Sequence, residues 1–146
     1  MLHYVVGGTM VTLIGSNVVN TLVSGTIDIL YNSASFVKNG TESNKVIETI
    51  KNDMAVLDIP IKLQLIQTLT EKAPNNEITH IIEQGLSDLI FKIKSVIEWI
   101  EYEISKHNSK WFAGYRSISI EDKMNELRNL VKILDGRISL LLNNIN

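Results

Sequence analysis

The strongest constraint on the fold of this chain is an apolar pattern that runs twice through its second half. From Glu77 to about His107, apolar residues recur three and four positions apart, as they do on one face of a helix. They are Ile82, Leu86, Leu89, Ile93, Val96 and Ile100, and the stripe is widened on one side by Ile90, Ile97 and Ile104. At about 1.5 Å per residue, roughly 31 residues make a rod of roughly 46 Å. The pattern returns over residues 120–143 and just beyond, at Met124, Leu127, Val131, Leu134, Ile138, Leu141 and Ile145.

Two such seams, joined by about a dozen residues, favour an antiparallel pair of long helices that the earlier helices close into a bundle. A dimeric coiled coil is the alternative. The widened stripe of residues 77–107 favours the core of a single bundle, because a two-stranded coiled coil needs only a narrow seam. Where the last pattern begins, Ser119 and Asp122 resemble a capping box, with Asp in place of the usual Glu.

The first half of the chain carries two weaker helical patterns. Residues 1–38 form an apolar, charge-poor segment that is predicted to be helical from about Thr9 and to end at Asn39-Gly40. Its stripe contains Met10, Leu13, Ile14, Val18, Leu22, Ile29 and Leu30. Residues 41–72 are predicted to form a Pro-interrupted helix or a pair of helices.

Thr41 is the candidate N-cap of this second segment, and Pro60 interrupts it. Asp58 is a candidate cap for the continuation, whose stripe contains Leu65, Ile66 and Leu69. The sequence therefore predicts one all-α domain over residues 1–146. We expect a four- to five-helix bundle with two long antiparallel C-terminal helices.

Composition excludes several classes of protein. The net charge is −2, so the whole molecule will not attract nucleic acid. The chain has no cysteine, which excludes disulfide scaffolds, Cys-type zinc sites and thiol catalysis. Hydrophobic residues make up 45% and charged residues 21%, which is typical of a folded globular protein.

The first 27 residues of the chain contain no charged side chain. The first acidic residue is Asp28 and the first basic one is Lys38. A secretory signal would begin with positive residues, which are missing here. A membrane span needs about 20 mainly apolar residues, but polar residues such as Asn17 and Asn20 interrupt this stretch repeatedly. Three interpretations stay open: a buried helix of the bundle, a membrane segment that awaits exposure, or the contact surface of an oligomer.

Motifs for catalysis are missing from the sequence. His80 stands near Glu77 and Glu83, and Glu103 lies one turn before His107, but a zinc site needs three or four converging ligands. Gly7-Gly8 lacks the Lys-Ser/Thr of a phosphate-binding loop, and there is no Gly-x-Ser-x-Gly elbow. We therefore expect a protein that is not an enzyme and that uses no metal or cofactor.

A loop that mixes aromatic and basic residues separates the two long patterns. Lys106, Lys110 and Arg116 are candidate ligands of anionic lipid headgroups, with Trp111 at the interface. The alternative, which the residues favour on their own, is that Trp111 and Phe112 close the end of the core while the basic side chains are only solvated.

The order of these segments resembles a known family. It comprises a Gly-dotted apolar first helix (residues 7–15), a polar turn (residues 37–40), a long amphipathic helix ending in Ser109-Lys110-Trp111-Phe112, and a last helix over residues 120–130 followed by Leu140-Leu141-Leu142. This arrangement resembles the N-terminal four-helix domain of the mixed-lineage kinase domain-like pseudokinase and the HeLo-type domains of fungi. Residues 1–37 contain no base, unlike the early helices of the pseudokinase, so the resemblance leans toward the fungal type.

The resemblance implies a module of programmed cell death or immune defence that moves from the cytoplasm to a membrane and permeabilises it. Its implied partners are anionic membrane lipids, further copies of the chain in a homo-oligomer, and an upstream sensor or kinase protein; nucleic acid is not among them. The residues expected to enter the membrane are Val5, Val6, Met10, Leu13, Ile14, Val18 and Leu22. The rival hypothesis is a non-enzymatic structural or adaptor bundle, such as a viral or scaffold component, that acts through protein–protein contacts.

Overall fold

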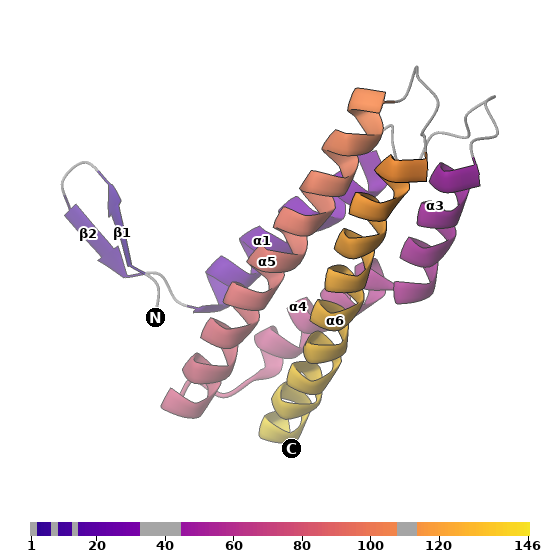
Figure 1. Cartoon of the computed structure of the whole chain (residues 1–146). Coiled ribbons are helices and arrows are strands. Elements are labelled where there is room, and N and C mark those ends of the chain that lie inside the picture. Colours follow the sequence, from indigo (N-terminus) through magenta and orange to yellow (C-terminus); the bar gives the residue numbers. More distant parts are fainter. Residues whose placement is uncertain (1–2, 7–8, 13–14, 33–44, 108–113) are drawn as a thin grey trace.

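A computed structural model describes the backbone of residues 3–6, 9–12, 15–32, 45–107 and 114–146, and the side chains of residues 17–32, 48–105 and 120–146. Within these residues, two short strands precede five helices (Figure 1). The elements are β1 (His3–Val6), β2 (Thr9–Thr12), α1 (Gly15–Asn32), α3 (Lys45–Leu57), α4 (Ile59–Lys72), α5 (Glu77–His107) and α6 (Gly114–Ile145).

The helices form a bundle in which α5 and α6 are the longest members and run antiparallel (Figure 1). α5 packs against α6 on one side and against α1 on the other, while α4 packs against both α1 and α6. α3 packs on α6 above α4. This order of contacts places α1 diagonally across the core from α6. The predicted all-α bundle with two long antiparallel C-terminal helices is confirmed.

The core consists of the two seams that the sequence predicts, together with residues from the earlier helices. Ile93, Ile97 and Ile100 of α5 and Leu127 and Leu134 of α6 are completely closed to solvent. α4 adds Ile59, Leu63 and Ile66, α3 adds Ile50 and Met54, and α1 adds Val19 and Val23. Because these side chains form one connected cluster, the hydrophobic effect acts on all the helices together.

The prediction of a helix from Thr9 onward is wrong for the first residues. Residues 3–6 and 9–12 form an antiparallel hairpin in which His3 pairs with Thr12 and Val6 with Thr9. Two short runs rich in Val, Thr and Tyr, separated by Gly7-Gly8, are a strong hairpin signal, and this local chemistry outweighs the helical spacing of Met10. The helix itself begins at Gly15 and ends at Asn32, so the predicted stop at Asn39-Gly40 lies outside the described residues.

The predicted stripe of the first helix is also rotated. Val19, Val23 and Thr26 are fully closed to solvent, whereas Leu22 and Ile29 are only partly buried. Val18 is buried as predicted. The buried side of α1 therefore carries small, β-branched residues, and its larger residues lie at the edges.

The segment before α5 is a pair of helices rather than one kinked helix. Asp58 joins them in the left-handed conformation, with φ 55° and ψ 39°, and its amide donates to the carbonyl of Ala55 at 3.2 Å. Asp58 does stand at the N-cap of α4, but its side chain makes no capping hydrogen bond, contrary to the prediction. Pro60 lies in the first turn of α4, where the backbone N–H that proline lacks would have no partner within the helix.

The buried stripe of α4 differs from the predicted one at a single position. Leu65 is exposed and Leu63 is buried in its place, so the prediction is wrong at Leu65. The candidate cap Thr41 lies outside the described residues.

The last helix begins earlier than predicted, at Gly114, and ends at Ile145. Ser119 is therefore inside the helix, and the predicted capping box with Asp122 is wrong. A capping box is a local signal, and a helix that lies against a long antiparallel neighbour gains enough from packing to begin before it.

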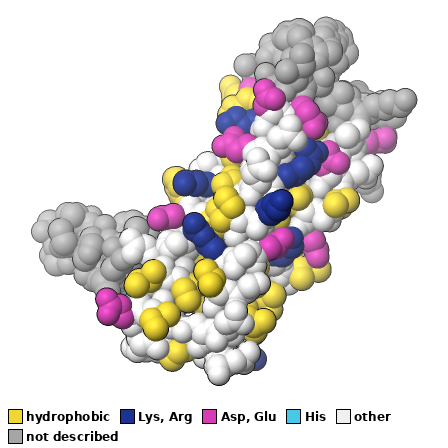
Figure 2. All heavy atoms as spheres, turned by 60° about the horizontal axis from the view of Figure 1, so that its bottom comes forward, with side chains coloured by type: hydrophobic (Ala, Val, Ile, Leu, Met, Phe, Trp, Pro, Cys, Tyr) yellow, Lys and Arg dark blue, Asp and Glu magenta, His cyan; other side chains and the backbone are white. Residues whose placement is uncertain are grey.

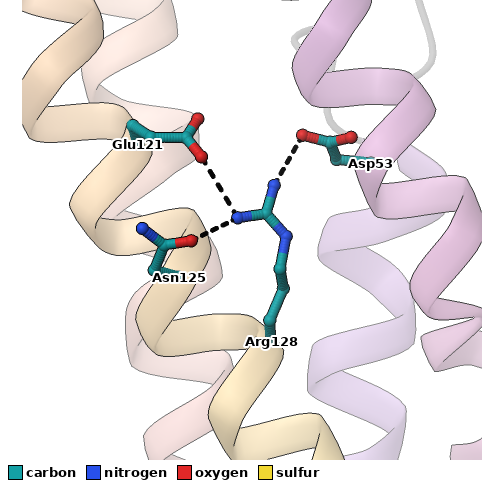
Figure 3. Close-up of polar contacts among 4 residues, drawn as sticks. All are labelled: Asp53, Glu121, Asn125 and Arg128. Atoms are coloured by element: carbon teal, nitrogen blue, oxygen red, sulfur yellow. Dashed lines mark hydrogen bonds and ion pairs between the residues drawn. The ribbon is translucent and has the colours of Figure 1, made fainter.

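Arg128 joins α6 to α3 at the surface of the bundle (Figure 3). Its Nη2 lies 2.7 Å from Oδ2 of Asp53, and its Nη1 lies 3.2 Å from Oε1 of Glu121 and also donates to Oδ1 of Asn125. Because the side chains of Arg128 and Asp53 are about one third exposed, water screens this ion pair. The cluster therefore orients α3 more than it stabilises the fold.

Three further polar contacts connect α6 with its neighbours. Nζ of Lys62 in α4 lies 2.9 Å from Oδ1 of Asp135. Arg137 donates to the carbonyl of Gly85 in α5, and Asn144 donates to the hydroxyl of Thr79 at 2.8 Å. α6 is thus fixed in register against α3, α4 and α5.

Because the core is closed and the ion pairs are exposed, we expect core packing to contribute more to the free energy of unfolding than the surface ion pairs do. Ile97→Ala should lower the free energy of unfolding by about 2–5 kcal/mol, because it leaves a cavity in a fully closed site. Arg128→Met should lower it by about 1 kcal/mol at most, because the lost pairs are partly exposed. Urea denaturation of the two variants measures both values, and a larger loss for Arg128→Met would contradict this account.

Candidate functional site

The candidate site is α1 and the surface on which it sits. α1 is the helix that follows the charge-free start of the chain, and Asp28 is its only charged residue. Asn17, Thr21, Ser24 and Asp28 are exposed on its outer side, and the small residues Val19 and Val23 face the core. α1 is therefore an amphipathic helix at a corner of the bundle, in contact with α4 and α5.

The described side chains of α1, residues 17–32, form no hydrogen bond or ion pair with another helix. The hydroxyl of Thr21 donates to the carbonyl of Asn17 at 2.9 Å, and that of Thr26 donates to the carbonyl of Leu22 at 2.7 Å. The amide of Asn32 donates to Asp28 one turn before it. Over these residues α1 is held by apolar packing alone, in contrast to α3, α4 and α5, which are all tied to α6.

Asn20 weakens this packing further. Its Oδ1 is buried and has no hydrogen-bond partner in the part of the chain that the structure describes. A buried carbonyl oxygen that gives up its water without a replacement costs about 1–3 kcal/mol. This penalty is paid only while α1 is docked, so it favours undocking.

The two ends of the described interface differ in how closely α1 approaches its neighbours. At Gly25 the helix comes near α5, and a Cβ on this glycine would lie 3.2 Å from Cε of Lys94. Beyond Gly25, the last turn of α1 borders a half-open cavity of about 340 Å³ rather than a filled contact with α3. Leu30, Tyr31, Lys51, Met54, Ala55, Asp58 and Pro60 line this cavity.

The structure does not bring the predicted membrane-insertion residues onto one helix. Val5 and Val6 lie in β1 and Met10 lies in β2. Val18 and Leu22 are in α1, the first buried and the second partly buried. Leu13 and Ile14 lie outside the described residues. The predicted helical stripe that joins Met10 to Val18 and Leu22 is therefore wrong at Met10, because the hairpin replaces the first part of the predicted helix.

Two of the predicted headgroup residues, Lys106 and Arg116, belong to the end of the bundle where α5 meets α6. Lys106 lies in the last turn of α5 and Arg116 in the first turn of α6, while Lys110 and Trp111 lie outside the described residues. α1 runs parallel to α5, with Gly25 beside Lys94. Lys106 is therefore roughly 18 Å farther along the bundle than Gly25, so its backbone does not lie beside Val18 or Leu22.

A buried polar stripe on α5 was not predicted from the sequence. Thr79, Glu83 and Ser87 are spaced one turn apart and are all buried. Burial raises the pKa of the Glu83 carboxyl above its ordinary value, and the electrostatic interaction with His80 lowers this pKa by a smaller amount. His80 itself lies 2.9 Å from Oδ1 of Asn75 through its Nε2. The only signal was a set of three polar residues at helical spacing, which on a helix this long is usually a solvated face.

The described ranges hold neither a metal site nor a membrane-spanning helix. No group of three or more His, Asp or Glu residues is placed to hold a metal ion there. Likewise, among the helices as far as they are described, none combines the length and apolar character of a membrane span. Comparisons with models of protein families, with curated proteins and with solved structures found no match.

Replacement of the unpaired amide of α1 should stabilise the protein. Asn20→Leu removes the buried carbonyl oxygen and adds apolar contact, so we expect the free energy of unfolding to rise by about 1–2 kcal/mol. Asn17→Leu, on the exposed side of the same helix, should change it by less than about 0.5 kcal/mol. If urea denaturation shows the same change in the free energy of unfolding for both variants, the unpaired Oδ1 of Asn20 does not destabilise the protein.

The stability of the protein should also fall as Glu83 ionises. Its pKa is raised in the folded state, so the folded protein binds more protons than the unfolded chain between 4.5 and the raised pKa. Stability from this group is thus greatest at low pH and is lost as the pH rises through the folded pKa. Glu83→Gln should raise the melting temperature at pH 7, and its advantage over the natural sequence should shrink toward pH 4.5. The exposed Glu71→Gln is the control and should show no such trend.

Proposed function

We propose that this protein is a cytoplasmic module that permeabilises membranes in programmed cell death or immune defence. In this proposal α1 leaves the bundle and enters the lipid together with the apolar segment before it. The partners are anionic membrane lipids and further copies of the chain, and an upstream sensor or kinase protein supplies the trigger. The proposal involves no catalysis and no cofactor.

The observation that carries the proposal is the way α1 is held. Its described side chains have no polar link to the other helices, and Asn20 Oδ1 is buried without a partner. By contrast, the other helices are joined through Arg128, Asp135, Arg137 and Asn144 of α6. α1 is therefore the helix whose departure breaks the fewest specific contacts, as a two-state switch requires.

Departure of α1 would also change the surface that it leaves. Val19 and Val23 would lose their place in the core, and the sides of α4 and α5 that they cover would face water. Both new apolar surfaces need to be covered, the first by lipid and the second by another copy of the chain. This couples membrane insertion to oligomerisation without a further motif.

The headgroup residues take a separate role in this proposal. Lys106 and Arg116 stand at the end of the bundle where α5 and α6 meet, and Lys110 and Trp111 lie between them in the sequence. Basic residues near a membrane surface contribute about 1 kcal/mol each when the lipid is anionic. They would hold the bundle on the membrane while α1 enters it elsewhere.

A structural or adaptor bundle is the second candidate. It is favoured by one observation, an apolar and exposed face on α5 and α6 that includes Ile81 and Leu140. An adaptor would bind protein through this face and would be indifferent to lipid.

A reversible crosslink between α1 and α5 tests the membrane proposal directly. The chain has no cysteine, so Gly25→Cys with Lys94→Cys introduces the only two thiols, at a place where the side chain of Lys94 already lies against α1. A short thiol-specific crosslinker with a reducible disulfide then locks α1 in place. We expect dye release from phosphatidylserine-containing vesicles to stop in the locked protein and to return after reduction.

The matched control locks two helices that the proposal keeps together. Lys62→Cys with Asp135→Cys replaces an existing contact between α4 and α6, and this crosslink should leave dye release unchanged. Release that continues in the α1–α5 crosslinked protein would contradict the proposal. A complete lack of release by the natural sequence, on neutral and anionic vesicles alike, would favour the adaptor.

A further inference from the structure

Glu83 of α5 is the one charged residue that the bundle buries among the side chains that the structure describes. It is 2% exposed, whereas acidic side chains ordinarily lie in water, as those on the face drawn in Figure 2 do. Its carboxyl forms no hydrogen bond or ion pair in the described part of the chain. The carboxyl therefore gives up its water without a replacement, and burial favours its protonated, uncharged form.

Helical spacing places Glu83 on the side of α5 that α1 covers. Eleven residues make about three turns, so Glu83 and Lys94 lie on one line along α5. Lys94 lies against α1 at Gly25, and Ser87, between them on this line, is also 2% exposed. Farther up the same line, Lys94 and Glu101 are only partly buried. An additional element therefore covers this line at the level of Glu83 and Ser87.

The start of α1 lies at this level. α1 runs parallel to α5 (Figure 1), and Gly25 lies beside Lys94, so the register brings the first residue of the helix, Gly15, to the level of Glu83. Val18, one turn into the helix, is 3% exposed, as expected of a residue packed on α5. The docked start of α1 thus keeps water from Glu83, and water reaches the carboxyl when α1 lifts.

Neighbouring charges do not hold Glu83 in its ionised form. His80, one turn earlier on α5, lowers the pKa of Glu83 by less than burial raises it. The chain before Asp28 brings no Asp, Glu, Lys or Arg to α1, and His3 of β1 is its one histidine. The other charged groups at this end of the bundle form no ion pair with Glu83; they are Glu71 and Lys72 of α4, Glu77 and Asp88 of α5, and Arg137 of α6, which donates to the carbonyl of Gly85.

We propose that Glu83 is a pH-dependent switch for the docking of α1, in which the protonated carboxyl keeps the start of the helix docked and its ionisation favours release. While α1 is docked, the pKa of Glu83 is raised by burial; when α1 lifts, this pKa returns toward its ordinary value of 4.5. The docked state then binds more protons than the lifted state. Docking is therefore most favourable at low pH and weakens as the pH rises through the docked pKa. This inference goes beyond the proposed function, because it concerns the docking of α1 in the absence of any membrane.

Native-state hydrogen exchange of the full chain from about pH 5 to pH 8 tests the switch. After correction for intrinsic exchange rates, the amides of residues 19–27 give the opening constant of α1, and those around Ile97 give the constant of global unfolding. We expect both constants to rise together, by up to about tenfold per pH unit below the docked pKa, because Glu83 reaches water in both openings.

Two variants connect this rise to the carboxyl of Glu83. In Glu83→Gln the opening constant of α1 should no longer depend on pH, because the amide does not titrate. In the exposed Glu71→Gln it should rise as in the natural sequence. Circular dichroism checks that both variants keep their helices.

Three results would overturn the proposal. If α4 and α6 alone bury Glu83, the constant of global unfolding rises with pH while that of residues 19–27 stays constant. A rise in the opening constant of α1 that Glu83→Gln retains would assign the pH dependence to another group. Exchange of residues 19–27 only through global unfolding would show that α1 has no separate docking step. Because this experiment contains no lipid, failure of the switch is distinguishable from failure of the membrane function, which dye release measures.

Discussion

The burial of the α5–α6 seam is the interaction on which the rest of the structure depends. Ile97 and Leu134 are fully closed to solvent at its centre, and the other helices are arranged around it. Polar contacts then fix α6 in register with α3, α4 and α5 through Arg128, Asp135 and Arg137. Since these contacts are partly exposed, they specify the arrangement, and the apolar seam supplies most of the stability.

The described side chains of α1 take no part in these polar contacts between helices. It contributes small side chains such as Val19 and Val23, it carries the unpaired Oδ1 of Asn20, and its last turn borders a cavity. A helix held in this way gains stability from burial but little from specific bonds. α1 packs closely on α4 and α5, but because its described side chains have no polar bond to the other helices, it is the moving part in the proposed switch. The proposed membrane function is built on this difference between α1 and the other helices.

The sequence predicted the long helices well because their apolar residues repeat at helical spacing over many turns, and no other secondary structure fits such a pattern. Local signals were less reliable. Gly7-Gly8 between two β-prone runs produced a hairpin where helical spacing predicted a helix, and Ser119 failed as a cap because α6 extends beyond it. The candidate site could be predicted only in part. The orphaned oxygen of Asn20 and the buried carboxyl of Glu83 depend on which helices pack together, and spacing along one helix does not reveal that.

Native-state hydrogen exchange of the free protein tests the central claim, that α1 opens separately from the rest of the bundle. The account predicts that the amides of residues 19–27 exchange through a partial opening, clearly faster than global unfolding. Those around Ile97 in α5 and Leu134 in α6 should exchange only when the whole protein unfolds. Exchange in α1 that is as slow as at Ile97 and Leu134, with the same dependence on denaturant, would contradict the claim.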